Sequence, residues 1–185
     1  MATTSVLISV DEYLSTVYRP DCDYVDGEVV ERNVGEKPHS RLQKLFLRFL
    51  AKFEEDLQVE ASPEQRLQIS DTRYRIPDVM LVSLSDSDDR IVRTPPLLCI
   101  EILSSEDRMS KIRERIQDYA RMGVKTSWVV DPWRRTAYLA GLDGVLHEVS
   151  QILLVEDTPI SITVDAIFAE LDRLEHRATA IPSAT

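Results

Sequence analysis

Apolar residues recur along several stretches of the chain with the spacing of α-helices. In residues 39–56, leucines and phenylalanines return every three or four positions, whereas most arginines and lysines lie off that stripe. This spacing predicts an amphipathic helix with one basic flank. Asp11 is placed to cap a short helix near the N-terminus, and Gly123 to end a longer one. Further helices are predicted within residues 10–19, 107–122 and 161–174.

Shorter apolar or alternating runs, bounded by turn residues, predict the strands. Residues 24–31 are typical of a β-hairpin with Asp26-Gly27 as its two-residue turn. Further strands are predicted at residues 58–60, 64–69, 74–82, 97–103 and 126–130, with a second hairpin formed by 136–139 and 145–149. This order predicts an α/β fold in which helices flank a mixed central β-sheet, with the N-terminal β-hairpin added to it. We expect a single domain over residues 1–177 and a disordered tail over residues 178–185.

The composition of the 185 residues is that of an ordinary globular protein, with 43% apolar and 29% charged residues. No apolar run approaches the ~20 residues of a membrane span, and the first residues lack the pattern of a signal peptide. Two cysteines are too few for a disulfide framework. We therefore expect a cytoplasmic protein with no membrane partner. The net charge of −10 argues against a generic nucleic-acid binder, but a basic groove can coexist with an acidic outer surface.

Two strand-like runs each contain one carboxylate that a buried strand would not be expected to carry. Asp78 lies in residues 75–82 and follows Pro77, which indicates a break in strand pairing. Glu101 is the only charged residue in residues 97–103. A buried carboxylate is costly unless it is paired, hydrogen-bonded or bound to a metal.

Two explanations fit this pair. One is a pair of buried ion pairs to arginines nearby in the sequence, which are Arg73, Arg75 and Arg108. The other is a hard-cation site for Mg²⁺ or Mn²⁺, in which Asp78, Glu101 and the backbone carbonyl of Ile102 form half of the ligand shell. Such a metal would lower the pKa of a bound water and offset charge that develops on a phosphodiester.

Several short segments, taken in order, resemble one known family. They are residues 24–30 (YVDGEVV), 76–79 (IPDV), 101–104 (EILS), 118–124 (DYARMGV) and 128–132 (WVVDP). Together they are similar to the Uma-type restriction endonuclease family of the PD-(D/E)XK nuclease superfamily, over roughly residues 8–150. The resemblance implies a restriction-endonuclease-like fold and a divalent-metal-dependent endonuclease that cuts DNA through metal-activated water. It also implies that Asp78 and Glu101 bind the metal, and by analogy that the protein is a homodimer.

The chain departs from the superfamily pattern where a lysine is expected after the glutamate. Leu103 stands at that position, and the helix residue that replaces the lysine in the Uma-type family is here Arg115. Lys111 lies one helical turn earlier on the same face. Arginine stays protonated and can only clamp phosphate and stabilise charge. Either residue could supply the positive charge, and either could belong to a solvated helix face.

Three further residues are candidates for the same site. Glu64 is expected on the strand that pairs with that of Asp78, where it could be a second metal ligand. Glu28 follows the hairpin turn and could approach the site. For both, an exposed strand carboxylate is the competing interpretation. His39 stands at the start of the basic-flanked helix, where a phosphate contact or a helix-start role competes with that of a general base.

Two functions other than DNA cleavage stay open. The missing lysine and the acidic charge favour a catalytically weakened binding or assembly module that keeps the nuclease fold. Hydrolysis of a smaller phosphorylated substrate is a third possibility, because an acidic surface would disfavour it less than it disfavours DNA.

Overall fold

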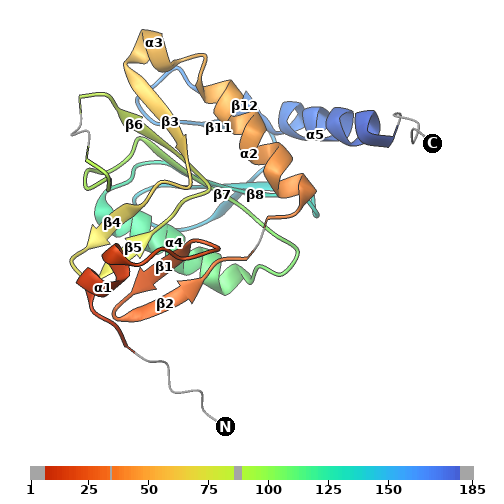
Figure 1. Cartoon of the computed structure of the whole chain (residues 1–185). Helices are drawn as coiled ribbons and strands as arrows, with labels where there is room; N and C mark the ends of the chain where they lie inside the picture. The colour runs from red at the N-terminus through yellow and green to blue at the C-terminus, as the bar shows by residue number, and fades with distance from the viewer. Residues whose placement is uncertain (1–6, 34, 86–88, 180–185) are drawn as a thin grey trace.

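A six-stranded sheet forms the centre of the molecule (Figure 1). The computed structural model describes residues 7–33, 35–85 and 89–179. The strand order in this sheet is β10-β9-β8-β7-β6-β3, and β7 and β8 are parallel whereas the other neighbours are antiparallel. The strands are β3 (Val59–Pro63), β6 (Val79–Ser83), β7 (Leu98–Ile102), β8 (Ser127–Asp131), β9 (Thr136–Ala140) and β10 (His147–Val149).

A second sheet of four strands, in the order β2-β1-β5-β4, lies in the lower half of Figure 1. Its strands are β1 (Cys22–Val25), β2 (Glu28–Glu31), β4 (Leu67–Ser70) and β5 (Arg73–Arg75). The predicted hairpin is confirmed, because β1 and β2 pair across Asp26 and Gly27, which both have positive φ as a tight hairpin turn requires. The short helix α1 (Val10–Ser15) packs its Tyr13 against Tyr24 and Tyr74 of this sheet.

Helices cover both faces of the six-stranded sheet. One apolar cluster joins α2 (Lys37–Leu50) and α5 (Val164–Thr179) to strand residues such as Val79, Ile100 and Val130. A second cluster joins α4 (Met109–Met122) to their strand neighbours, which include Met80, Cys99 and Val129. Successive strand residues thus point to opposite faces, and each face packs on a helix. The mixed α/β fold with an N-terminal hairpin is confirmed.

Several element boundaries differ from the prediction. The helix expected over residues 39–56 ends at Leu50, and a separate turn of helix, α3 (Glu54–Leu57), follows it. Ser9, not Asp11, caps α1 with its side-chain oxygen. Residues 161–163 form β12 (Ser161–Thr163), which pairs with β11 (Ile152–Leu154), a strand that the pattern missed. Helix α5 continues to Thr179, and residues 180–185 of the predicted tail lie outside the described residues.

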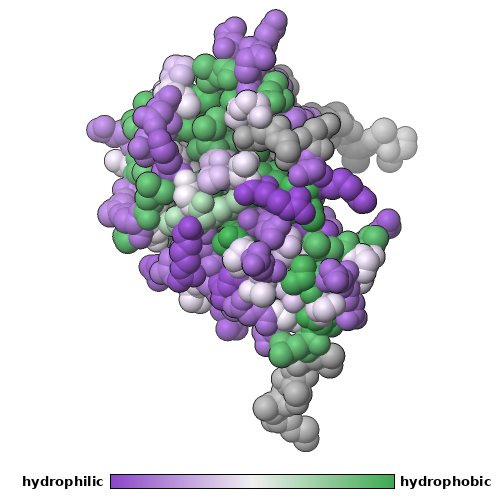
Figure 2. Space-filling model, turned by 90° about the vertical axis from the view of Figure 1, so that its left-hand side faces the viewer, coloured by the Kyte–Doolittle hydropathy of each residue, from purple (hydrophilic) through white to green (hydrophobic). Residues whose placement is uncertain are grey.

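Most of the face shown in Figure 2 carries hydrophilic side chains, with apolar ones scattered between them. Within residues 7–33, 35–85 and 89–179, no helix has the length and apolar character needed to cross a membrane. The apolar side chains scattered over the face in Figure 2 are ordinary on a folded surface.

Candidate active site

Asp78 lies at the place where the chain passes from one sheet to the other. The single strand predicted over residues 74–82 is in fact two strands, because β5 ends at Arg75 and β6 begins at Val79. Pro77 has no N–H to donate to a ladder, so the break falls where its position predicts. Asp78 is thereby released from strand pairing while its backbone stays anchored on both sides.

Strand register brings the two sequence-predicted carboxylates to neighbouring positions. Val79 of β6 is opposite Ile100 of β7, so the next step along this antiparallel register places Asp78 beside Glu101. On the other side of β6, Pro63 is opposite Val79, which places Glu64 next to Asp78. A hydrogen bond from the Glu64 N–H to the Asp78 carbonyl, at 3.3 Å, agrees with this placement.

Asp78 is buried and surrounded by donors. Its Oδ2 accepts a hydrogen bond of 2.7 Å from the N–H of Ile102 and lies 3.2 Å from Nε2 of His39. Its Oδ1 forms an ion pair with Arg32, which follows the end of β2. Gln43 on α2 donates to its backbone carbonyl at 2.9 Å. These contacts come from β7, α2 and the hairpin, so three separate parts of the chain position one carboxylate.

The pKa of Asp78 is lowered by these partners. Burial by itself would raise it, but the hydrogen bond from His39 and the charge of Arg32 outweigh burial. The same contact acts on the imidazole: burial alone would lower the pKa of His39, but the hydrogen bond and charge of Asp78 raise it. Asp78 is therefore held as a carboxylate, next to a histidine that favours its charged form.

Glu101 is only 1% exposed and is held from helix α4. Its Oε2 accepts a hydrogen bond of 2.9 Å from Nη1 of Arg115, and its Oε1 accepts one from the hydroxyl of Tyr119. Arg115 and Tyr119 are four residues apart and share one helix face. Burial raises the pKa of Glu101, and the negative charge of Asp78 adds to this, although Arg115 opposes it.

Arg32 links the two carboxylates electrostatically. Although burial alone would lower its pKa, attraction to Asp78 and Glu101 raises it. Its Nε is buried and has no hydrogen-bond partner in the described part of the chain. The guanidinium thus supplies positive charge to both carboxylates, which is the role a divalent cation would take.

The donor chemistry of the pair fits a hard divalent cation, since both side chains offer carboxylate oxygens at adjacent strand positions. Among the described residues, however, no three His, Cys, Asp or Glu side chains are grouped so as to hold a metal. A metal would therefore depend on Asp78, Glu101, a backbone carbonyl and water. The backbone N–H of Ile102 donates a hydrogen bond to Asp78. The backbone carbonyl of Ile102 stays a predicted metal ligand.

A buried network of charges, missed in the sequence, lies behind Glu101. Asp23 of β1 is fully buried and binds Arg115 at 3.1 Å and Arg75 at 3.0 Å. Arg75 also binds Asp118 of α4 at 2.6 Å. Asp23 carries the signal that identified Asp78, a carboxylate inside a strand, and could have been found in the same way. Arg32 and Tyr119 gave no such signal.

Two of the three arginines proposed as ion-pair partners from sequence, Arg73 and Arg75, bind other acids, and no ion pair of Arg108 with Asp78 or Glu101 is found among the described residues. Arg73 binds Asp26 and Asp118, and Arg75 binds Asp23, Glu114 and Asp118. The partners of Asp78 and Glu101 are instead Arg32 and Arg115.

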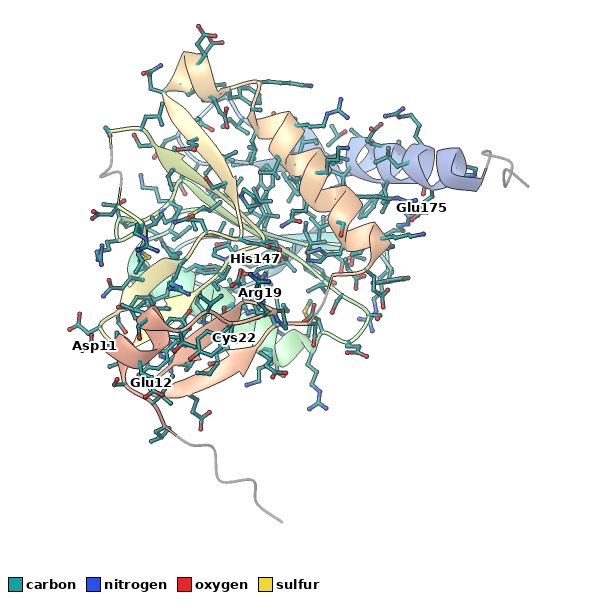
Figure 3. The ribbon with its side chains drawn as sticks, viewed as in Figure 1. Asp11, Glu12, Arg19, Cys22, His147 and Glu175 are labelled. Carbon is teal, nitrogen blue, oxygen red and sulfur yellow. The ribbon has the colours of Figure 1, made fainter. Side chains whose placement is uncertain are left out.

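The remaining candidates divide between two cavities. A cavity of about 480 Å³ is lined by Asp78, His39 and Glu64, together with Arg19, which is labelled in Figure 3. The exposed Glu64 accepts a long hydrogen bond of 3.4 Å from Gln43.

The second cavity, of about 330 Å³, is lined by Glu28, Lys111 and Arg115. The side chain of Lys111 is 66% exposed and lies 3.8 Å from Glu114. The structure thus brings His39 and Arg115 to the carboxylate pair, and it leaves Lys111 and Glu28 in the neighbouring cavity.

A mixed central sheet with helices on both faces, joined by an N-terminal hairpin, is the restriction-endonuclease-like fold that the sequence predicted. The sequence matches the Uma2 family, described as "Putative restriction endonuclease", over residues 10–171. The chain belongs to this family.

One solved structure supports the fold. The chain is similar to a crystal structure described as "a putative nuclease belonging to DUF820" from Anabaena variabilis, with a TM-score of 0.80 and 19% sequence identity, over 89% of this chain and 99% of that chain. A cryoEM structure of a DrdV-DNA complex matches with a TM-score of 0.40 and 15% identity, over 71% of this chain and 11% of that chain. No curated protein matches the chain.

Proposed function

We propose that this protein is a divalent-metal-dependent endonuclease that hydrolyses phosphodiester bonds in DNA. The observation that carries the proposal is the placement of Asp78, immediately before β6, beside Glu101 of β7, each buried and each held by an arginine. Structural ion pairs alone would not require two carboxylates side by side, since like charges at this spacing disfavour each other. Membership of the Uma2 family supports the same function.

In this proposal Asp78 and Glu101 hold Mg²⁺ or Mn²⁺ with the carbonyl of Ile102, and Glu64 is a further candidate ligand. A bound Mg²⁺ would activate a coordinated water and offset charge that develops on the phosphate. Asp78 is prepared for this role by its lowered pKa. His39 contacts Asp78 directly, so we assign it a positioning role. Glu28, in the neighbouring cavity, has no assigned step.

Arg115 is the better candidate for the missing lysine. It donates to Glu101 at 2.9 Å, whereas Lys111 is mostly exposed and faces Glu114. Because arginine does not release its proton in proteins, Arg115 would stabilise negative charge on the phosphate and would not deprotonate the attacking water. The charge of the guanidinium also opposes the rise that burial causes in the pKa of Glu101.

A plasmid-nicking assay with Mn²⁺ tests the proposal. We expect wild type to nick supercoiled DNA, and we expect Asp78→Asn and Glu101→Gln each to reduce the rate by at least about 100-fold. Glu60→Gln is a matched control, since Glu60 is an exposed carboxylate on the neighbouring strand β3. Equal nicking by wild type and Asp78→Asn would contradict the assigned site.

One observation favours a second candidate, a binding or assembly module that keeps the nuclease fold. Both carboxylates already have partners without a metal. Asp78 contacts Arg32 and His39, and Glu101 accepts hydrogen bonds from Arg115 and Tyr119. Absence of cleavage with millimolar Mn²⁺ would favour this module, provided that the protein is folded.

Cleavage of both strands of a duplex would call for two such sites, and we therefore propose a homodimer. Light scattering during size-exclusion chromatography measures the mass. A monomer of 21.1 kDa at micromolar concentration would contradict the proposed dimer and leave the metal site untouched.

A further inference from the structure

A turn beside the candidate site presents an exposed aromatic ring. Strands β7 and β8 are parallel, with Glu101 opposite Val129. Both strands therefore end at the same edge of the sheet, which is where ligands commonly bind in sheets with parallel strands. Beyond β8 the chain turns through Pro132, Trp133 and Arg134 before it enters β9.

Asp131 holds this turn in a fixed conformation. Its Oδ1 accepts hydrogen bonds from the backbone N–H groups of Trp133, at 2.8 Å, and Arg134, at 2.9 Å. Asp131 is itself buried. The ring of Trp133 is thus attached to a turn that is ordered before any ligand arrives, which reduces the entropic cost of binding.

The indole of Trp133 is available for a contact that the fold does not use. The residue is 49% exposed, and no ring pair or cation–π contact involves it in the described part of the chain. By contrast, Trp128, the other tryptophan, is fully buried and packs on Phe46. Trp128 therefore belongs to the core, whereas the ring of Trp133 lies on the surface.

Trp133 lines a cavity of about 350 Å³ together with Arg134, Met109 and Ser104. Asp107 lines both this cavity and the one that contains Arg115. The cavity therefore adjoins the side of the site from which Arg115 reaches Glu101.

The cavity is lined by side chains of both charges, the carboxylates of Asp107 and Asp131 and the guanidinium of Arg134. Asp107 accepts from the N–H and hydroxyl of Ser104, at 2.6 and 2.9 Å, and Asp131 is occupied by the turn. The side chain of Arg134 is 77% exposed, with its Nε 4.0 Å from Asp131. An exposed aromatic face next to a guanidinium is the combination that binds single-stranded nucleic acids.

We propose that Trp133 stacks on an unpaired base of a single-stranded DNA segment, and that Arg134 contacts the backbone phosphate next to it. The inference rests on the proposed nuclease function and specifies the substrate: DNA with an unpaired base close to the cleaved phosphate. Stacking would also supply binding energy that does not depend on charge, which suits a chain with a net charge of −10.

Binding of a fluorescein-labelled ten-nucleotide oligothymidylate, measured by anisotropy in EDTA, tests this proposal without cleavage. We expect Trp133→Ala to bind about tenfold more weakly than wild type, because stacking is lost. An abasic strand of the same length should bind wild type as weakly as thymidylate binds Trp133→Ala. Tryptophan fluorescence should be quenched by thymidylate in wild type and not in Trp133→Phe, since Trp128 is buried.

Leu142→Ala is the matched control, because Leu142 is an exposed apolar residue in the next turn. Equal affinity of wild type and Trp133→Ala, or of thymidylate and abasic strands, would overturn the proposal. A change in oligomeric state of Trp133→Ala without a change in oligonucleotide affinity would also overturn it and assign the ring to a protein interface. Plasmid nicking is a separate readout. If wild type binds the oligonucleotide through Trp133 but does not nick plasmid, the proposed nuclease function is contradicted and the stacking proposal is not.

Discussion

Asp78 and Glu101 lie at neighbouring strand positions, yet their surroundings differ in kind. Asp78 lines an open cavity, and its partners come from three parts of the chain, so that its pKa is lowered. Glu101 is enclosed under helix α4, held by Arg115 and Tyr119, and its pKa is raised. Both residues carry a carboxylate, but the surroundings of Asp78 favour its ionised form whereas those of Glu101 disfavour it.

In the proposed function, this difference would give the two carboxylates separate tasks. Asp78 would bind a cation that enters from the cavity. Burial raises the pKa of Glu101, the charge of Arg115 opposes that rise, and a metal would oppose it further. Variants that change the surroundings of one carboxylate at a time test whether each carboxylate depends on its own partners.

The largest effect is expected from Arg115→Ala. Removing the guanidinium leaves two buried carboxylates, those of Glu101 (1% exposed) and Asp23 (0% exposed), without the ion pair that Arg115 makes to each. Breaking a buried ion pair by removing one partner costs about 3–5 kcal/mol. Urea unfolding at neutral pH measures the change in free energy. Arg113→Ala, at an exposed position of the same helix, is the control; equal losses in the two variants would refute the role of Arg115.

Tyr119→Phe should have the next largest effect. It removes the hydroxyl that donates to Glu101 and keeps the buried ring. A hydrogen bond to a charged group contributes about 1.5–3 kcal/mol, and its loss should raise the pKa of Glu101 further. Thermal unfolding and titration of Glu101 by NMR measure the two changes. Tyr138→Phe on β9 is the control, and an unchanged pKa of Glu101 would contradict the assignment.

A smaller, pH-dependent effect is expected from His39→Gln in EDTA. The folded-state pKa of His39 is raised above its ordinary 6.5, so the folded chain holds the proton more tightly than the unfolded chain. The stabilisation is complete below 6.5 and is lost as pH rises through the folded-state pKa. Wild type should exceed the variant by about 1 kcal/mol at about pH 6. A difference that grows with rising pH would contradict this sign.

Lys111→Ala should have the smallest effect. Lys111 is largely exposed, and its ion pair with Glu114 spans 3.8 Å, so little stability depends on it. We expect an unchanged unfolding midpoint and unchanged plasmid nicking. A loss of nicking comparable to that of Glu101→Gln would assign the lysine role to Lys111 and overturn the preference for Arg115.

Local pattern was sufficient to predict the fold class, and strand burial drew attention to Asp78 and Glu101. Pro77 also indicated the break that releases Asp78, because its effect on the ladder is local. Arg32 could not be predicted, since it lies 46 positions from Asp78 and the contact exists only once the two sheets meet. The pairing of Arg73 and Arg75 with Asp118 was missed for the same reason.

Calorimetry with Mn²⁺ on the metal-free protein tests most directly whether Asp78 and Glu101 together form a metal site. We predict that wild type binds Mn²⁺, that Asp78→Asn and Glu101→Gln each abolish binding at millimolar metal, and that Glu60→Gln binds as wild type does. Binding by Asp78→Asn that equals wild type, or no binding by folded wild type, would contradict a metal site formed by this pair.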